Sequence, residues 1–304
     1  MKFETIKNAL GDGLLSFPIT DMDGNGNFDA RSFTDRVHWF MQHHISAVFV
    51  AGGTGEFFSL SKQEYSQIVS IASKTVDGKV PVLSSIGRSI PEAIEFIKIA
   101  ESAGIDGLLL MPPYLTGCPE DGLIAYAKTI LENTKLPVVY YNRANGTLSS
   151  SAIKQLADAC PNLIALKDGT GNMQELNDTI KTVGDRLTYI GGVPTAEIIS
   201  EAYLSIGVNT YSSAVFNFVP ELALSFYKAL RAGERSKVES IIKSFFIPFI
   251  HLRSKKSGYA VSLIKAGAAL IGKPAGDVRA PLEMPTGPEI AELKMLIEKS
   301  SDLL

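Results

Sequence analysis

Cysteine is scarce in this 304-residue sequence, and its scarcity excludes a disulfide framework. Only Cys118 and Cys160 are present, and neither has a partner at the spacing of a metal site. A chain that does without disulfides suits a reducing compartment, so we expect a cytoplasmic protein. The first five residues also lack the charged and then apolar pattern of a secretory signal.

Clustered basic residues and long apolar runs are also missing. The formal net charge is −3, and no basic stripe is visible along the chain. We therefore expect no nucleic-acid partner. No apolar run reaches the roughly 20 residues that a membrane-spanning helix needs, so we expect no membrane partner either. The content of 45% hydrophobic and 20% charged residues is typical of a globular enzyme.

Candidate metal ligands are few, since the sequence has only four histidines. His43 and His44 are neighbours in a predicted helix, where adjacent side chains do not face each other. The stretch 21–29 resembles the start of a calcium loop, but Ser32 stands where that loop requires a glutamate. A dinucleotide fingerprint and a P-loop are also absent. We therefore expect no metal and no cofactor.

What the sequence does contain is a regular alternation of short apolar runs and longer amphipathic stretches. Continuous apolar strands separated by helices predict a parallel sheet that is covered on both faces. We expect eight strands, at Gly13–Pro18, Ala47–Ala51, Val80–Ile86, Gly107–Met111, Pro137–Tyr141, Leu163–Lys167, Leu187–Gly191 and Asn209–Ser213. Such a series predicts an α/β fold, the (β/α)8 TIM barrel, with a doubly wound open sheet as the alternative.

The strand signal stops after about Pro220, and helical patterns follow. They cover Glu221–Ala232, Glu234–His251, Ser257–Ile271 and Glu289–Lys299, with glycine and proline between them. The first of these helices would complete a barrel formed by residues 1–232. Residues 233–304 would then form a C-terminal helical segment that packs on the barrel.

Lys167 is the most informative residue, because it ends an apolar strand and precedes a glycine-rich turn. Barrel enzymes work at the carboxyl ends of their strands, so its amine is expected at the mouth of the barrel. A desolvated lysine loses its proton more easily, and the neutral amine can attack a ketone to form a Schiff base. The alternative is that only the apolar stem packs while the ammonium reaches water.

The ends of two other strands supply groups that complement an amine. In the turn after the second strand, the backbone of Gly53, Thr54 and Gly55 could hold a carboxylate, although an ordinary turn would look the same. Tyr141 could transfer protons as a catalytic residue, or simply pack at the rim. Glu56 is expected to orient the turn rather than to act as an acid.

Residues at the ends of the fifth, seventh and eighth strands complete the candidate substrate site. Arg143 offers a planar guanidinium to a second carboxylate, and a surface salt bridge is the alternative. Ser212 and Ser213 provide hydroxyls for the same distal end of a substrate. Gly192 follows the seventh strand.

These motifs resemble the dihydrodipicolinate synthase / N-acetylneuraminate lyase superfamily. The resemblance is carried by 52–56, Tyr141-Asn142, the strand that ends in Lys167 and Gly191-Gly192, and it covers nearly the whole chain. It implies a (β/α)8 barrel with a Schiff-base lysine on the sixth strand. It also implies a 2-oxo acid substrate and a homo-oligomer, either a tetramer or a dimer.

Within the superfamily, the longer motifs are most similar to the dehydratases that act on 5-dehydro-4-deoxy-D-glucarate. These motifs are Asp12–Pro18, Ala51–Leu60, Tyr141–Arg143, Tyr211–Pro220 and Lys256–Ala266. The resemblance implies a lyase of sugar-diacid (glucarate or galactarate) breakdown, which converts this 2-oxo sugar diacid to 2,5-dioxopentanoate, carbon dioxide and water. The alternative is a class I aldolase that releases pyruvate from another 2-oxo sugar acid. A barrel that binds a 2-oxo acid without turnover is a further alternative.

Three positions depart from the pattern of the synthases. Gly53 stands where the synthases have a relay threonine, and Leu115 where they have a tyrosine that reaches the neighbouring subunit. Gly146 stands near the place of the arginine that binds their second substrate. These departures disfavour a synthase and a plain sialic-acid lyase.

Overall fold

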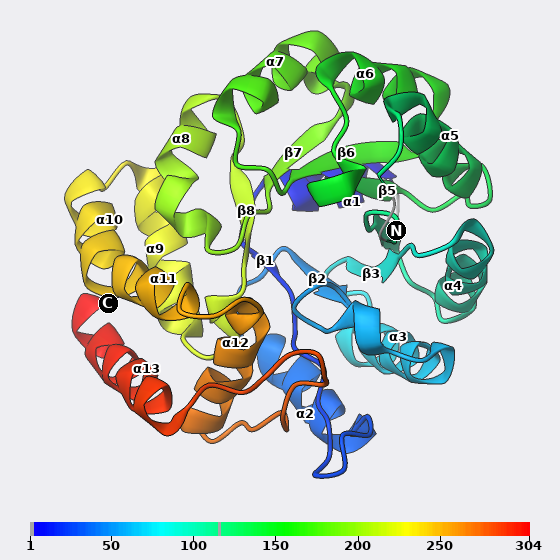
Figure 1. The fold of residues 1–304 in the computed structure, drawn as a ribbon. Helices are drawn as coiled ribbons and strands as arrows, with labels where there is room; N and C mark the ends of the chain where they lie inside the picture. The colour runs from blue at the N-terminus through cyan, green and yellow to red at the C-terminus, as the bar shows by residue number, and fades with distance from the viewer. Residues whose placement is uncertain (1–2, 115–116) are drawn as a thin grey trace.

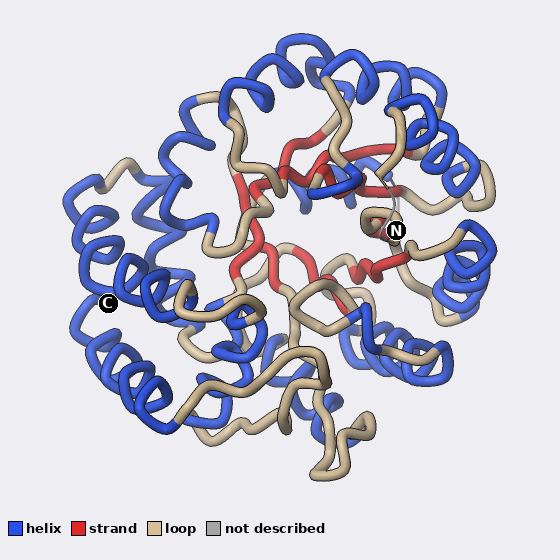
Figure 2. The backbone as a smooth tube through the Cα atoms, in the orientation of Figure 1, coloured by secondary structure: helices blue, strands red, loops and turns tan. Residues whose placement is uncertain are grey.

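A computed structural model describes residues 3–114 and 117–304, so Leu115 lies outside the described residues. Eight parallel strands form a closed barrel, in which β8 pairs with β1 (Figures 1 and 2). The strands are β1 (Leu15–Ser16), β2 (Ala47–Val50), β3 (Val82–Ile86), β4 (Gly107–Leu110), β5 (Val138–Asn142), β6 (Leu163–Asp168), β7 (Thr188–Gly191) and β8 (Thr210–Ser213). The predicted (β/α)8 fold is confirmed, and closure of the sheet excludes the doubly wound alternative.

Helices surround the barrel as an outer ring (Figure 1). They are α2 (Ala30–Phe40), α3 (Lys62–Val76), α4 (Ile90–Ser102), α5 (Glu120–Leu131), α6 (Ser150–Ala159), α7 (Met173–Val183), α8 (Ser200–Ser205) and α9 (Pro220–Ala232). Local signals fix several starts: α3 and α4 each begin with a capping box, Ser61 with Glu64 and Ser89 with Glu92. The outward faces of the strands and the inward faces of these helices form one apolar core.

One helix, α1 (Phe3–Gly11), was not predicted. It contacts β6 and β7, and its fully buried Ile6 and Leu10 join the apolar interior of the barrel. The spacing of Phe3, Ile6 and Leu10 is the amphipathic signal that could have identified it. Because α1 adds apolar side chains to this interior, it helps to make the barrel a packed core rather than a pore.

The C-terminal segment consists of α10 (Arg235–Ile241), α11 (Ile247–Arg253), α12 (Tyr259–Leu270) and α13 (Gly287–Ser300). The single helix predicted for Glu234–His251 is divided by a π-helical stretch, Ile242–Phe246. Pro248, in the first turn of α11, has no N–H group to continue an α-helical ladder across this point. Helix α12 contacts the turn that follows β8, so the segment borders the mouth of the barrel.

No helix in the described ranges is both long enough and apolar enough to cross a membrane.

Candidate active site

Lys167 lies inside the barrel mouth, where the register of two strands places it beside Tyr141. The two residues are direct partners in the pairing of β5 with β6. Lys167 is only 3% exposed, and its Nζ lies 3.9 Å from the centre of the Tyr141 ring and 5.1 Å from that of Phe17. The interpretation in which the ammonium reaches water is therefore wrong for this conformation, because the whole side chain is buried.

The surroundings of Lys167 favour its neutral form. Burial lowers the pKa of this amine, although the nearby Tyr141 oxygen acts in the opposite direction. The next residue, Asp168, does not serve as a partner. Its carboxylate accepts hydrogen bonds from the Thr170 side chain at 2.7 Å and from Tyr203 Oη at 2.7 Å. These contacts fix the turn after β6. Among the described residues Lys167 forms no ion pair with a carboxylate, and Asp168 acts on the amine only through its charge.

Tyr141 combines a proton donor with a positively charged neighbourhood. Its Oη donates to the Gly192 carbonyl at 2.8 Å and accepts from Arg143 Nη1 at 3.0 Å. Burial alone would raise the pKa of this phenol, but the charge of Lys167, while that amine is protonated, and the charge of Arg143 outweigh burial and lower the pKa overall. A phenol whose pKa is lowered exchanges its proton more readily, as a general acid and base must.

Gly192 connects these two groups. Its carbonyl oxygen accepts hydrogen bonds from Tyr141 and from Lys167 Nζ, the latter at 3.2 Å. A Cβ atom at this position would lie 2.6 Å from Lys167 Nζ and 2.7 Å from the Asp168 carbonyl oxygen. Only glycine therefore fits between the lysine and the turn that carries it.

A cavity of about 320 Å³ opens onto these residues, a size suited to a small molecule. Its lining includes the predicted residues Gly53, Thr54, Tyr141, Arg143, Lys167, Gly192 and Ser212. Two predicted residues lie elsewhere. Gly55 is buried against Thr20, whose hydroxyl donates to the Gly55 carbonyl at 2.6 Å. Ser213 donates to Glu197 Oε1 at 2.7 Å, because successive side chains of a strand face opposite sides.

Two residues of the C-terminal segment were missed by sequence reasoning. Arg253 of α11 lines the same cavity. Lys265 of α12 forms a fully buried ion pair with Glu56 at 2.7 Å, and Glu56 also accepts the backbone N–H of Arg279 at 2.9 Å. These contacts agree with the structural role expected for Glu56. Lys265 lies within the motif Lys256–Ala266, but the sequence names no partner for it.

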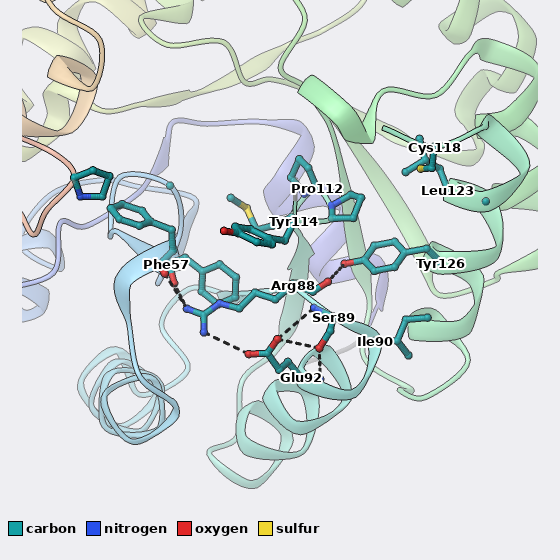
Figure 3. A pocket seen from close by; sticks show the side chains of 16 residues that line it. Phe57, Arg88, Ser89, Ile90, Glu92, Pro112, Tyr114, Cys118, Leu123 and Tyr126 are labelled. Atoms are coloured by element: carbon teal, nitrogen blue, oxygen red, sulfur yellow. Dashed lines mark hydrogen bonds and ion pairs between the residues drawn. The ribbon is translucent and has the colours of Figure 1, made fainter. Parts of the chain in front are cut away.

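A second cavity, of about 1100 Å³, adjoins the first and shares Gly53 and Phe58 with it. In Figure 3, Arg88 extends across this cavity near Phe57 and Tyr114. The guanidinium of Arg88 donates to the carbonyl of Phe57 at 2.6 Å and that of Leu60 at 2.9 Å. No lysine is part of its described lining, so the carbonyl chemistry belongs to the smaller cavity.

Comparisons with known proteins agree with this arrangement. A family model described as the dihydrodipicolinate synthetase family matches residues 11–300. A relative from Rhizobium meliloti, named as a probable 5-dehydro-4-deoxyglucarate dehydratase, is 48% identical over 300 residues, which are 99% of each chain. A relative of the same name from Rhodococcus opacus is 46% identical over 298 residues, which are 98% of each chain.

Two solved structures share the whole architecture. The dihydrodipicolinate synthase of Oceanobacillus iheyensis superimposes with a TM-score of 0.89 at 25% identity, over 98% of this chain and 99% of that one. YagE from E. coli K12, a member of the dihydrodipicolinic acid synthase family solved in complex with pyruvate, gives a TM-score of 0.86 at 27% identity. That alignment covers 96% of this chain and 99% of YagE.

Proposed function

The chain belongs to the dihydrodipicolinate synthetase family, and on this premise we propose that it is a 5-dehydro-4-deoxyglucarate dehydratase. The enzyme converts this six-carbon keto diacid to 2,5-dioxopentanoate, carbon dioxide and water. Relatives at 46% and 48% identity over nearly their full length carry this name. The observation that carries the chemistry is Lys167, a buried amine of lowered pKa beside Tyr141 in a cavity.

The first step joins the substrate ketone to Lys167. The backbone N–H groups of Gly53 and Thr54 hold the carboxylate next to the ketone. The neutral amine attacks the ketone carbon, and loss of one water gives a protonated imine. The Gly192 carbonyl keeps the amine in place, and Tyr141 assists the proton transfers that this condensation requires.

The second step removes water from the substrate. The protonated imine acidifies the adjacent methylene, and a base assisted by Tyr141 takes one of its protons. The resulting enamine pushes its electrons toward the neighbouring carbon, whose hydroxyl leaves as water after protonation. The product of this step is an imine conjugated with a carbon–carbon double bond.

The third step releases carbon dioxide. The bond to the distal carboxylate breaks, and its electron pair moves through the conjugated system to the imine nitrogen. The dienamine gains a proton on carbon, its terminal enol becomes an aldehyde, and hydrolysis frees 2,5-dioxopentanoate and the Lys167 amine. The same imine accepts electrons in the loss of water and again in the loss of carbon dioxide, so Lys167 serves both steps.

Reduction by borohydride tests the proposal. With the keto diacid or with pyruvate, the wild-type protein should gain one reduced adduct, and peptide mapping should place it on Lys167. The Lys167→Met variant should gain none. An adduct on another residue contradicts the mechanism. Product analysis separates the two lyases, since pyruvate plus an aldehyde would establish the aldolase and overturn the dehydratase.

We further propose a cytoplasmic homo-oligomer, either a dimer or a tetramer. Two large side chains at the edge of the second cavity support association, since Phe58 is 50% exposed and Tyr114 is 73% exposed. Light scattering combined with gel filtration measures the mass directly. A mass of about one chain at micromolar concentration would contradict this proposal.

A further inference from the structure

We propose that Arg253, supplied by the C-terminal segment, binds the distal carboxylate of the substrate and makes the site selective for diacids. The inference rests on the proposed function, because it names the group that recognises the second carboxylate of that substrate. It differs from the expectation that Arg143 takes this role.

Arg253 is positioned by two elements that meet at the cavity. It is the last residue of α11 and lines the cavity that contains Lys167. Its Nη1 donates to the hydroxyl of Thr195, which follows β7 and is almost fully buried. Ser212, on the neighbouring strand β8, lines the same cavity. Together, Thr195, Ser212 and Arg253 form a polar wall whose only charge is positive.

The charge of this wall has no ion-pair partner in the described part of the protein. No carboxylate there lies within ion-pair distance of Arg253, and the described lining of the cavity contains Lys167, Arg143 and Arg253 but no aspartate or glutamate. The acid that acts on Arg253 is Glu197, which is buried and bonded to Ser213. Burial raises the pKa of Glu197 to about 7, which weakens it as a counter-ion at neutral pH.

A partly buried guanidinium without a carboxylate is unfavourable until an anion binds to it. Burial also lowers the pKa of Arg253, as expected where solvation of the cation is incomplete. A dianionic substrate removes this cost when its second carboxylate reaches the guanidinium. A monoanion of the same length leaves the cost in place. The cavity therefore discriminates by charge, and not only by shape.

Arg143 is less suited to this role because its guanidinium already has a function. Arg143 is exposed at the rim, and its Nη1 donates to Tyr141 Oη at 3.0 Å. Its guanidinium carbon also lies 5.6 Å from the centre of the Tyr141 ring. Beside the charge of Lys167, this contact helps to lower the pKa of Tyr141, so Arg143 serves the proton transfer. Arg253 has no such contact with the catalytic pair.

The test compares two arginine variants on two substrates. Arg253→Met removes the charge while keeping most of the side-chain volume, and Arg143→Met is the matched control. One substrate is the keto diacid. The other is the six-carbon 2-oxo acid that ends in a primary alcohol, which can form the imine and lose water but has no distal carboxylate to release as carbon dioxide. For Arg253→Met we expect kcat/KM for the diacid to fall by roughly 10- to 100-fold, mainly through KM. Borohydride trapping with pyruvate, which has no second carboxylate, should proceed at the wild-type rate.

Two further variants separate recognition from folding. Arg253→Lys should recover part of the affinity for the diacid, because it keeps the charge. Thr195→Val removes the hydroxyl that positions Arg253 but keeps the arginine, so it should lower the preference for the diacid by less than Arg253→Met does. If Arg253→Met does not fold, these two variants still show whether Arg253 recognises the distal carboxylate.

Each other outcome has a definite meaning. An equal loss with pyruvate and with the diacid would show that Arg253 only holds the loop after β7, and the inference would fail while the Schiff-base chemistry stood. A selective loss in Arg143→Met, with Arg253→Met unaffected, would assign the distal carboxylate to Arg143. Wild-type protein that traps pyruvate but does not turn over the diacid would instead contradict the proposed function.

Discussion

At the scale of single residues, the site depends on one backbone carbonyl. The Gly192 oxygen accepts from both Lys167 and Tyr141, and no Cβ fits at this position. In Gly192→Ala, the methyl group would meet Lys167 and the backbone oxygen of Asp168, which cannot rotate away. We expect the amine to move and the rate of imine formation with pyruvate to fall by about 100-fold or more. Borohydride-dependent inactivation measures this rate.

Gly24→Ala is the control for this substitution, since a Cβ at Gly24 has no atom within 4 Å. It should form the imine at the wild-type rate. A Gly192→Ala variant with unchanged imine formation would show that the lysine tolerates displacement, and that the close fit is incidental.

Tyr141 is predicted to affect turnover more than imine formation. Tyr141→Phe keeps the ring beside Lys167 but removes the hydroxyl that contacts Gly192 and Arg143. A positioned proton shuttle contributes roughly 100- to 10,000-fold, so we expect a loss of kcat in this range. The adduct with pyruvate should still be trapped on Lys167. Equal turnover by the variant would assign the proton transfers to water or to another side chain.

Glu197 should make the stability of the protein depend on pH. Its pKa is raised from 4.5 to about 7 by burial, so the folded protein holds a proton between these values that the unfolded chain has lost. Stability therefore falls as pH rises from 4.5 to 7. Glu197→Gln has no such titration. Its stability relative to wild type should increase across this window by up to roughly 3 kcal/mol. Denaturant unfolding at several pH values measures the change, and parallel profiles would contradict the prediction.

The candidate residues at strand ends could be predicted because barrel chemistry gathers at one end of the strands. Lys167, Tyr141, Gly53 and Ser212 were placed in one cavity by this rule alone. The rule could not choose between Ser212 and Ser213, since a shift of one residue reverses the face of a strand. The place of Arg253 in the site could not be predicted, for another reason. It lies on a helix beyond the last strand, and nothing local states which end of the barrel that helix covers.

At the scale of elements, a buried ion pair links helix α12 to the turn after β2. Lys265 and Glu56 are both fully buried, and their charged atoms are 2.7 Å apart. Lys265→Met would leave the Glu56 carboxylate without its partner. We expect a loss of about 3–5 kcal/mol in the free energy of unfolding, measured by denaturant titration. The turn that precedes Glu56 includes Gly53 and Thr54, so KM for the substrate should rise as well.

The double variant Lys265→Met with Glu56→Gln is the control for this pair. Glutamine can still accept the backbone N–H of Arg279 but carries no charge. The double variant should be more stable than Lys265→Met alone. Strictly additive losses would show that the two side chains are not energetically coupled.

Elements were predictable where the local pattern was strong. The eight strands were recognised because each is a short apolar run bounded by turn residues, and tertiary packing then set their ends. Helix α1 was missed because it is short, and the spacing of Phe3, Ile6 and Leu10 is a weak signal over so few turns. The π-helical stretch Ile242–Phe246 was missed because its sequence continues the apolar pattern of the surrounding helix. Only the geometry of hydrogen bonds distinguishes it.

At the scale of the whole molecule, the barrel and the C-terminal segment share one apolar core. Phe218, in the loop after β8, packs on Phe249 of α11 with ring centres 5.9 Å apart. Phe226 of α9 meets Phe246 at 5.0 Å, and Gly267 of α12 lets the Phe218 ring approach its backbone. The segment also supplies Lys265 and Arg253 to the barrel. Helices lie on both sides of residue 232, α9 before it and α10 after it, and the apolar core continues across this point.

From this continuity we predict that residues 1–232 do not fold alone. Without residues 233–304, the rings of Phe218 and Phe226 would be exposed, and Glu56 would lack its partner Lys265. The fragment should show no cooperative thermal transition and should aggregate. The full chain should unfold in one cooperative transition. Its calorimetric enthalpy of unfolding per chain should then equal the van't Hoff enthalpy. A fragment that unfolds cooperatively would divide the molecule into two domains, and Arg253 would then be a residue brought to the site by domain docking.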